Sequence, residues 1–77
     1  MNTKLNEIIV STLHIPPARV TDDLAMSEVE TWDSLQHMNL IASIEQAFEV
    51  ELTFEEIVAM QSIGEIKRVL AGKGAEV

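Results

Sequence analysis

The sequence predicts an all-α fold: a bundle of four helices, with a long loop between the first two helices and a short third helix. Hydrophobic residues recur at three- and four-residue spacing, the pattern of helices that bury one face. Two segments begin with a serine or threonine three positions before a glutamate, which is a typical helix start. Because 47% of the 77 residues are hydrophobic, the chain can form a core, and we expect residues 1–77 to be a single domain.

The first helix is indicated by residues at helical spacing: Leu5, Ile8, Ile9, Thr12 and Leu13. It must end before the Pro16-Pro17 pair, since proline lacks a backbone N–H and restricts the residue before it. A long loop from Ala18 to Asp33 follows, and a connection of this length is often functional. Four apolar residues are expected to anchor it: Val20, Leu24, Met26 and Val29.

The second helix is predicted from Ser34 to Phe48. At about 100° per residue, its apolar residues cover well over half of the circumference. They are Leu35, Met38, Leu40, Ile41, Ala42, Ile44, Ala47 and Phe48. The one polar stripe consists of Gln36, Asn39, Ser43 and Gln46. We therefore expect this helix to be the central element of the core, with neighbours on several sides.

The last two helices have explicit start signals. Thr53 with Glu56 forms a possible capping box, and Ser62 with Glu65 repeats it before the apolar residues of the fourth helix. Gly72 stands where a glycine is expected to end a helix. Three basic residues suit the negative end of that helix dipole: Lys67, Arg68 and Lys73.

The charge distribution excludes several classes of partner. The formal net charge is -8, and residues 20–66 contain eleven Asp and Glu but no Lys or Arg. Such a field repels the phosphates of nucleic acids and of anionic membranes, so neither is an expected partner. The acidic surface either serves solubility alone or forms a docking face for a basic partner.

Other classes of site are excluded by missing residue types and spacings. Without cysteine there is no disulfide framework, thiolate nucleophile or zinc-ribbon spacing. The acids Asp22, Asp23, Glu28 and Glu30 lack the spacing and glycine of a calcium loop, so no metal site is expected. No segment has the length of a signal peptide core or a membrane span, and we expect a cytoplasmic protein.

The segment Trp32-Asp33-Ser34-Leu35 lies where the long loop meets the second helix. A serine at a helix N-terminus is usually a cap, but Asp33 is also a capable cap and would leave the Ser34 hydroxyl free. A helix N-terminus favours a phosphate through its unpaired N–H groups and the positive end of the dipole. A serine placed there is therefore suited to carry a phosphodiester.

This segment resembles the attachment motif of acyl carrier proteins and their carrier-domain relatives. The resemblance covers nearly the whole chain, from Leu5 to Leu70, and includes the helix order, the length and the acidity. Similar residues also stand at matching positions: Asp22, Asp23, Leu40, Ile44, Glu45, Phe48, Leu52, Glu55 and Glu56.

The resemblance implies a carrier without catalysis of its own. A phosphopantetheinyl transferase attaches a 4′-phosphopantetheine arm to Ser34, and the thiol of the arm holds an acyl or related group as a thioester. Acyl-loading and acyl-processing enzymes with basic docking patches are the implied partners of a monomeric carrier. The expected partner-binding residues are Asp33, Leu35, Gln36, Met38, Asn39, Glu45, Glu55 and Glu56.

A cleft between the second and third helices is a candidate shelter for an acyl chain. Its expected lining is Met38, Ile41, Ile57 and Met60. Methionine adapts well to such a role, although residues at this spacing also form ordinary cores.

The chain departs from the housekeeping fatty-acid carriers at several positions. Gln36 and Asn39 are neutral where those carriers have acids, and Trp32 replaces a small residue. These departures indicate a specialised carrier that serves a dedicated pathway.

The aromatic and histidine residues near Ser34 have alternative roles. Trp32, the only tryptophan, is either a packing anchor or a partner contact. His37 is expected at the surface near the arm, since a hydrolytic Asp33–Ser34–His37 triad also needs an oxyanion hole and a substrate cleft. His14 is expected to be only a favourable charge at the end of the first helix.

Two other functions stay open at this point. One is an aminoacyl or peptidyl carrier of the same family. The other is an unmodified acidic helical adaptor that binds a basic partner.

Overall fold

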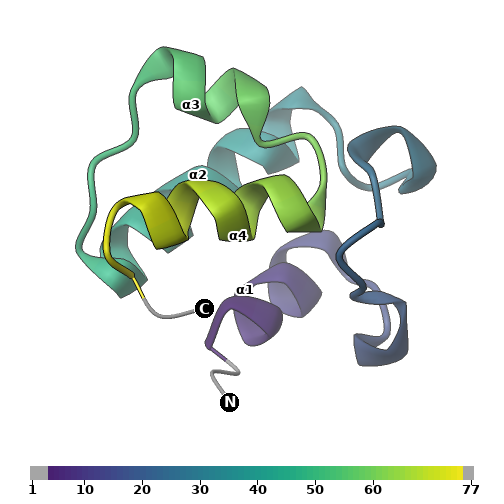
Figure 1. Cartoon of the computed structure of the whole chain (residues 1–77). Coiled ribbons are helices and arrows are strands. Elements are labelled where there is room, and N and C mark those ends of the chain that lie inside the picture. Colours follow the sequence, from purple (N-terminus) through teal and green to yellow (C-terminus); the bar gives the residue numbers. More distant parts are fainter. Residues whose placement is uncertain (1–3, 76–77) are drawn as a thin grey trace.

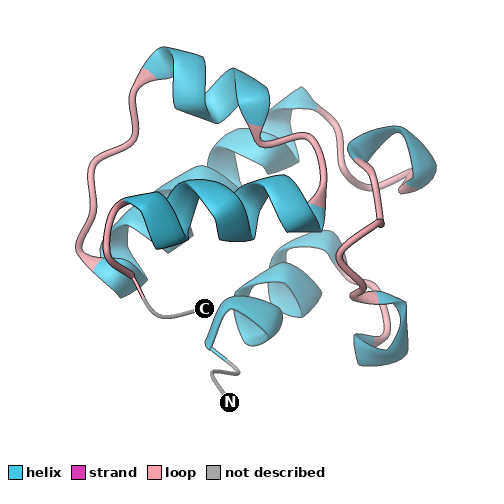
Figure 2. Ribbon diagram, viewed as in Figure 1, coloured by secondary structure: helices cyan, strands magenta, loops and turns pink. Residues whose placement is uncertain are grey.

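The computed structural model describes residues 4–75, and every regular element in that range is helical (Figure 2). The four α-helices are α1 (Lys4–Leu13), α2 (Ser34–Phe48), α3 (Phe54–Ala59) and α4 (Ile63–Gly72). The predicted all-α fold with a short third helix is confirmed. Two short 3-10 turns, η1 (Pro17–Arg19) and η2 (Met26–Glu28), lie in the connection that was predicted as loop alone.

The helices surround a core to which the long connection also contributes. In Figure 1, α4 crosses in front of α2, while α3 lies above this pair and α1 below it. No residue within α3 itself is buried, so this helix lies at the periphery. The buried apolar residues are Leu5, Ile9, Leu13, Ile15, Leu24, Val29, Trp32, Leu40, Ile41, Ile44, Met60, Ile63, Ile66 and Leu70.

The α2 helix is central, but it is covered on fewer sides than its sequence predicts. Its buried residues are His37, Leu40, Ile41 and Ile44, which follow helical spacing along one face. Leu35 is 68% exposed and Met38 is 53% exposed, so the expectation that α2 has neighbours on several sides does not hold for these two residues. Within residues 4–75 these two side chains are largely uncovered, and this leaves apolar surface next to Ser34.

The long connection is held by the start of α4. The first N–H groups of a helix have no acceptor within it. In this fold, the N–H of Ile63 donates to the carbonyl of Leu24 (3.0 Å), and that of Gly64 donates to the carbonyl of Asp22 (2.8 Å). An ion pair between Lys67 and Asp22 (2.7 Å) lies beside them. These contacts fix the connection whose far end carries Trp32 and Asp33.

The predicted helix starts are confirmed, with one difference between them. Thr53 and Glu56 form both halves of a capping box. The hydrogen bond from the N–H of Thr53 holds the pKa of the Glu56 carboxyl below its usual value, and the hydrogen bond from Lys73 adds a smaller effect in the same direction. Ser62 also caps α4, but the carboxylate of Glu65 pairs with Arg68 instead of completing a box.

The predicted end of the last helix is wrong. Gly72 is still helical, and Gly74 adopts the left-handed conformation, with φ +83°. The three basic residues expected near this end are all in ion pairs, Lys67 with Asp22, Arg68 with Glu65 and Lys73 with Glu56.

Gly64→Ala should destabilise the fold, because an added Cβ would lie 2.9 Å from the Asp22 carbonyl oxygen. We expect a loss of about 1–3 kcal/mol in the free energy of unfolding, measured by urea denaturation. Gly72→Ala is the matched control, since a Cβ there meets no atom within 4 Å. Alanine is the better helix former, so the control should gain up to about 1 kcal/mol. Equal effects of the two substitutions would contradict the close approach.

Candidate functional site

Ser34 is the first residue of α2, and the preceding residue caps the helix in its place. Asp33 is extended, with φ -98° and ψ -175°, and its side chain accepts a hydrogen bond from the N–H of Gln36 at 2.9 Å. The Ser34 side chain is exposed and makes no hydrogen bond to another residue in the range 4–75. The hydroxyl is thus free, at a helix end that favours an anion.

A hollow of ≈ 250 Å³ opens beside Ser34, between α2 and α3. Its lining includes no Asp, Glu, Lys or Arg. The residues are Met26, Ser34, His37, Met38, Phe54, Ile57, Val58 and Gln61. The site therefore combines a free hydroxyl with an adjoining apolar hollow that is smaller than most small-molecule pockets.

Trp32 and His37 form a buried pair under the site. Trp32 is 2% exposed, and its indole N–H donates to Nδ1 of His37 at 3.0 Å. His37 Nε2 lies 2.8 Å from the carbonyl oxygen of Ile57 in α3. The expectation of a surface His37 is wrong, because both ring nitrogens have partners inside the fold and the residue is only 8% exposed.

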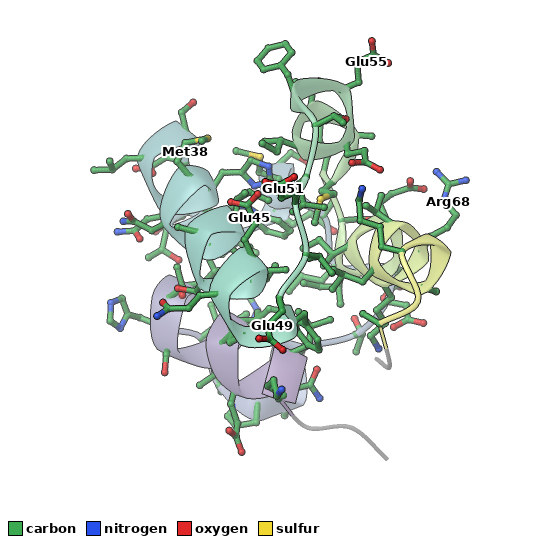
Figure 3. All side chains as sticks on the ribbon, turned by 90° about the vertical axis from the view of Figure 1, so that its left-hand side faces the viewer. Met38, Glu45, Glu49, Glu51, Glu55 and Arg68 are labelled. Carbon is green, nitrogen blue, oxygen red and sulfur yellow. The ribbon has the colours of Figure 1, made fainter. Side chains whose placement is uncertain are left out.

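The three predicted partner-binding glutamates lie in different surroundings. Glu45 is half-buried and accepts the N–H of Leu52 at 3.0 Å, which holds the link between α2 and α3. Glu56 is occupied by the N–H of Thr53 and by Lys73. Glu55 projects from the outer side of α3, away from Met38 on α2 (Figure 3). Only Glu55 of the three is exposed.

The other predicted partner-binding residues lie near Ser34. Asp33, Leu35, Met38 and Asn39 are exposed, and Gln36 is half-buried. The amide of Asn39 donates to the Gln36 side chain at 3.2 Å.

The four predicted acyl-pocket residues are divided between the hollow and the core. Met38 and Ile57 line the hollow beside Ser34. Ile41 and Met60, at 2% and 0% exposure, are packed in the core and do not line it.

Four residues that line the hollow were not predicted from the sequence: Met26, Phe54, Val58 and Gln61. Phe54 and Val58 are four positions apart, and this spacing places them on one side of α3. Their exposure could not be judged from the sequence, since an apolar face on a helix does not show which other elements cover it. Met26 and Gln61 lie next to each other through the hydrogen bond from Met26 N–H to the Gln61 carbonyl (2.8 Å), a long-range contact without a local signal.

Two kinds of feature are absent from the described part of the chain. Residues 4–75 contain no group of three or more His, Cys, Asp or Glu side chains that could hold a metal ion. None of the helices in this range has the length and hydrophobicity needed to cross a membrane.

Comparison with known proteins identifies the family. A family model described as "Phosphopantetheine attachment site" matches residues 3–70. The chain belongs to this family. It is 26% identical over 66 residues to an acyl carrier protein of Wolinella succinogenes, covering 86% of this chain and 87% of that protein. It is also 28% identical over 76 residues to an acyl carrier protein of Amoebophilus asiaticus, covering 99% and 95% respectively.

A solved structure shares the fold. The solution NMR structure of the holo acyl carrier protein from Geobacter metallireducens superimposes with a TM-score of 0.80. The match covers 94% of this chain and 86% of the other, at 23% identity.

Membership of the family defines the general role of this protein. The chain is a carrier with a covalently attached phosphopantetheine, and it is not an enzyme. It holds its cargo as a thioester and interacts with a transferase and with processing enzymes.

Proposed function

We propose that Ser34 is the residue that carries the phosphopantetheine arm, and that the chain presents acyl intermediates on this arm to the enzymes of a dedicated pathway. The observation that carries the proposal is the exposed Ser34 hydroxyl, which Asp33 leaves free by capping α2 itself. The position at the helix N-terminus supports it further, because the dipole there stabilises the negative charge of a phosphodiester.

The residues around Ser34 suit the attachment reaction. In the transfer, Ser34 Oγ forms a bond to the phosphorus next to pantetheine while the P–O bond of the pyrophosphate linkage in coenzyme A breaks. The nucleotide part leaves as 3′,5′-ADP, and the serine proton is released. Once attached, the group supplies the thiol that holds the cargo. This chain contributes the nucleophilic oxygen, the orientation of α2 and the field of its N-terminus.

The hollow beside Ser34 supports an uncharged, apolar cargo. No charged side chain lines it, and Met38, Ile57 and Val58 provide apolar surface. An aminoacyl group would bring its ammonium into this apolar setting without a carboxylate in the lining, which is unfavourable. The lining thus favours an acyl carrier over an aminoacyl or peptidyl carrier.

The surface around the site supports partners that dock through apolar contacts. Within residues 4–75, the large exposed hydrophobic residues are Leu35 (68%), Met38 (53%), Phe54 (78%) and Val58 (48%), which we call the apolar patch. Three of them line the hollow with Ser34, so an enzyme that reaches Ser34 has to approach over the patch. The neutral Gln36 and Asn39 on the same helix add no charge there.

Incubation with coenzyme A, magnesium and a broad-specificity phosphopantetheinyl transferase should add one phosphopantetheine to the wild-type chain. The measurement is intact mass. Ser34→Ala should gain nothing, because it lacks the oxygen that forms the new bond. A modified Ser34→Ala would place the arm elsewhere. An unmodified wild type, shown to be folded, would favour the unmodified adaptor.

Phe54→Ser should lower kcat/KM for arm transfer by about tenfold, mainly through KM, because aromatic residues such as phenylalanine are enriched at protein interfaces and this one is exposed beside the site. Glu55→Gln is the matched control at the neighbouring exposed position, and we expect a change below about threefold, since a rim charge contributes little. Steady-state kinetics at low and high salt provide the measurement. A larger effect of Glu55→Gln, lost at high salt, would show that charge dominates docking.

A further inference from the structure

Helix α3 forms one wall of the hollow, yet little of it is buried. Four of its six residues are exposed, Ile57 and Glu56 are half-buried, and none is fully buried. A helix of this length is not stable alone in water. Segments with few buried contacts open most readily, so the position of α3 depends on the individual contacts that hold it.

One of these contacts is a hydrogen bond between His37 and the backbone of α3. The Nε2 atom of His37 lies 2.8 Å from the carbonyl oxygen of Ile57, across a sequence separation of 20 residues. The contact is partly buried, where a hydrogen bond is electrostatically stronger than in water. It connects the middle of α3 to the first turn of α2.

Trp32 determines which ring nitrogen of His37 carries the proton. An indole N–H can only donate, so Nδ1 of His37, 3.0 Å from Trp32 Nε1, has to accept. The neutral ring then has its hydrogen on Nε2, which donates to the Ile57 carbonyl. The two bonds select the same tautomer and hold the ring from both sides.

The two hydrogen bonds link Trp32, His37 and Ile57 into a set that we call the bridge, and it lies beside the hollow next to Ser34. His37 lies three positions after Ser34 on α2, and both residues line the hollow together with Ile57. The hydrogen bond between His37 and Ile57 therefore connects α2 to α3 beside the serine. The third member of the bridge, Trp32, belongs to the connection that also supplies the cap of α2.

We propose that His37, held by Trp32 in the Nε2–H tautomer, is the positioning residue of this site: it fixes α3 against α2 and so maintains the hollow beside Ser34. The idea that the hollow serves a cargo on Ser34 rests on the proposed function, whereas the two hydrogen bonds of the bridge do not depend on it. His37 touches no reacting atom in this role and acts through Ile57.

The first test uses the chain without its arm. Nitrogen-15 NMR of the wild-type histidine ring should show Nε2 protonated and Nδ1 as an acceptor. In His37→Leu, the amide hydrogens of α3 should exchange about tenfold faster or more, as expected for the loss of a buried hydrogen bond, while those of α1 and α4 change less than about threefold. Protonation on Nδ1 in the wild type, or an equal rise in all helices, would overturn the proposal.

Two further variants separate the bonds of the bridge. Trp32→Phe removes the indole donor and keeps an aromatic ring, so it should weaken the tautomer preference and raise α3 exchange to a rate between those of wild type and His37→Leu. His37→Gln offers an amide N–H that can reach the Ile57 carbonyl, and it should restore slow exchange in α3 relative to His37→Leu. Failure of glutamine to slow α3 exchange, in a folded variant, would contradict a role through Ile57. If His37→Leu does not fold, α3 exchange in His37→Gln and Trp32→Phe is compared with that in the wild type instead.

The second test uses the chain loaded with a hexanoyl arm. In the wild type, loading should shift the methyl signals of Met38 and Val58, and in His37→Leu these shifts should fall by at least half. Unchanged shifts in His37→Leu would overturn the positioning role. If the wild type takes no arm, the proposed function fails, and the exchange experiment still decides the bridge.

Discussion

The hydrogen bond from the N–H of Gln36 to the Asp33 carboxylate is the contact on which the site depends. The first N–H groups of α2 need acceptors from outside the helix, and two adjacent residues could supply one. Because Asp33 does so, Ser34 stands one position inside the helix with an exposed, unbonded hydroxyl. A serine used as the cap would turn its oxygen toward the backbone and away from an incoming enzyme.

The rest of the fold holds Asp33 and Ser34 in place and shapes their surroundings. The start of α4 anchors the long connection through Leu24 and Asp22, and the buried Trp32 fixes its far end against His37. On the other side of the hollow, α3 contributes exposed apolar residues instead of core residues. The result is a small bundle in which α2 presents one exposed serine, and in which α3, the helix with no buried residue, borders that serine.

Local signals in the sequence were sufficient to find the four helices and the starts of the last three, because proline, the capping residues and the apolar spacing act over a few positions. The bounds of α2 and the capping box of Thr53 with Glu56 were predicted in this way, whereas the sequence left open whether Asp33 or Ser34 caps α2. The burial of His37 could not be predicted, since its partners are a tryptophan in the loop and a backbone carbonyl 20 positions away. Likewise, the exposure of Leu35 and Met38 depends on which faces of α2 other helices cover.

The most direct test compares the free energies of unfolding of two single variants, Asp33→Ala and Ser34→Ala, by urea denaturation. If Asp33 caps α2 and Ser34 is free, Asp33→Ala should lose about 1 kcal/mol and Ser34→Ala should stay within about 0.5 kcal/mol of wild type. Asp33→Asn should retain most of the stability, because its side-chain oxygen can accept the same hydrogen bond. A large loss in Ser34→Ala together with a neutral Asp33→Ala would show that the serine is the cap, and would contradict the account of the site.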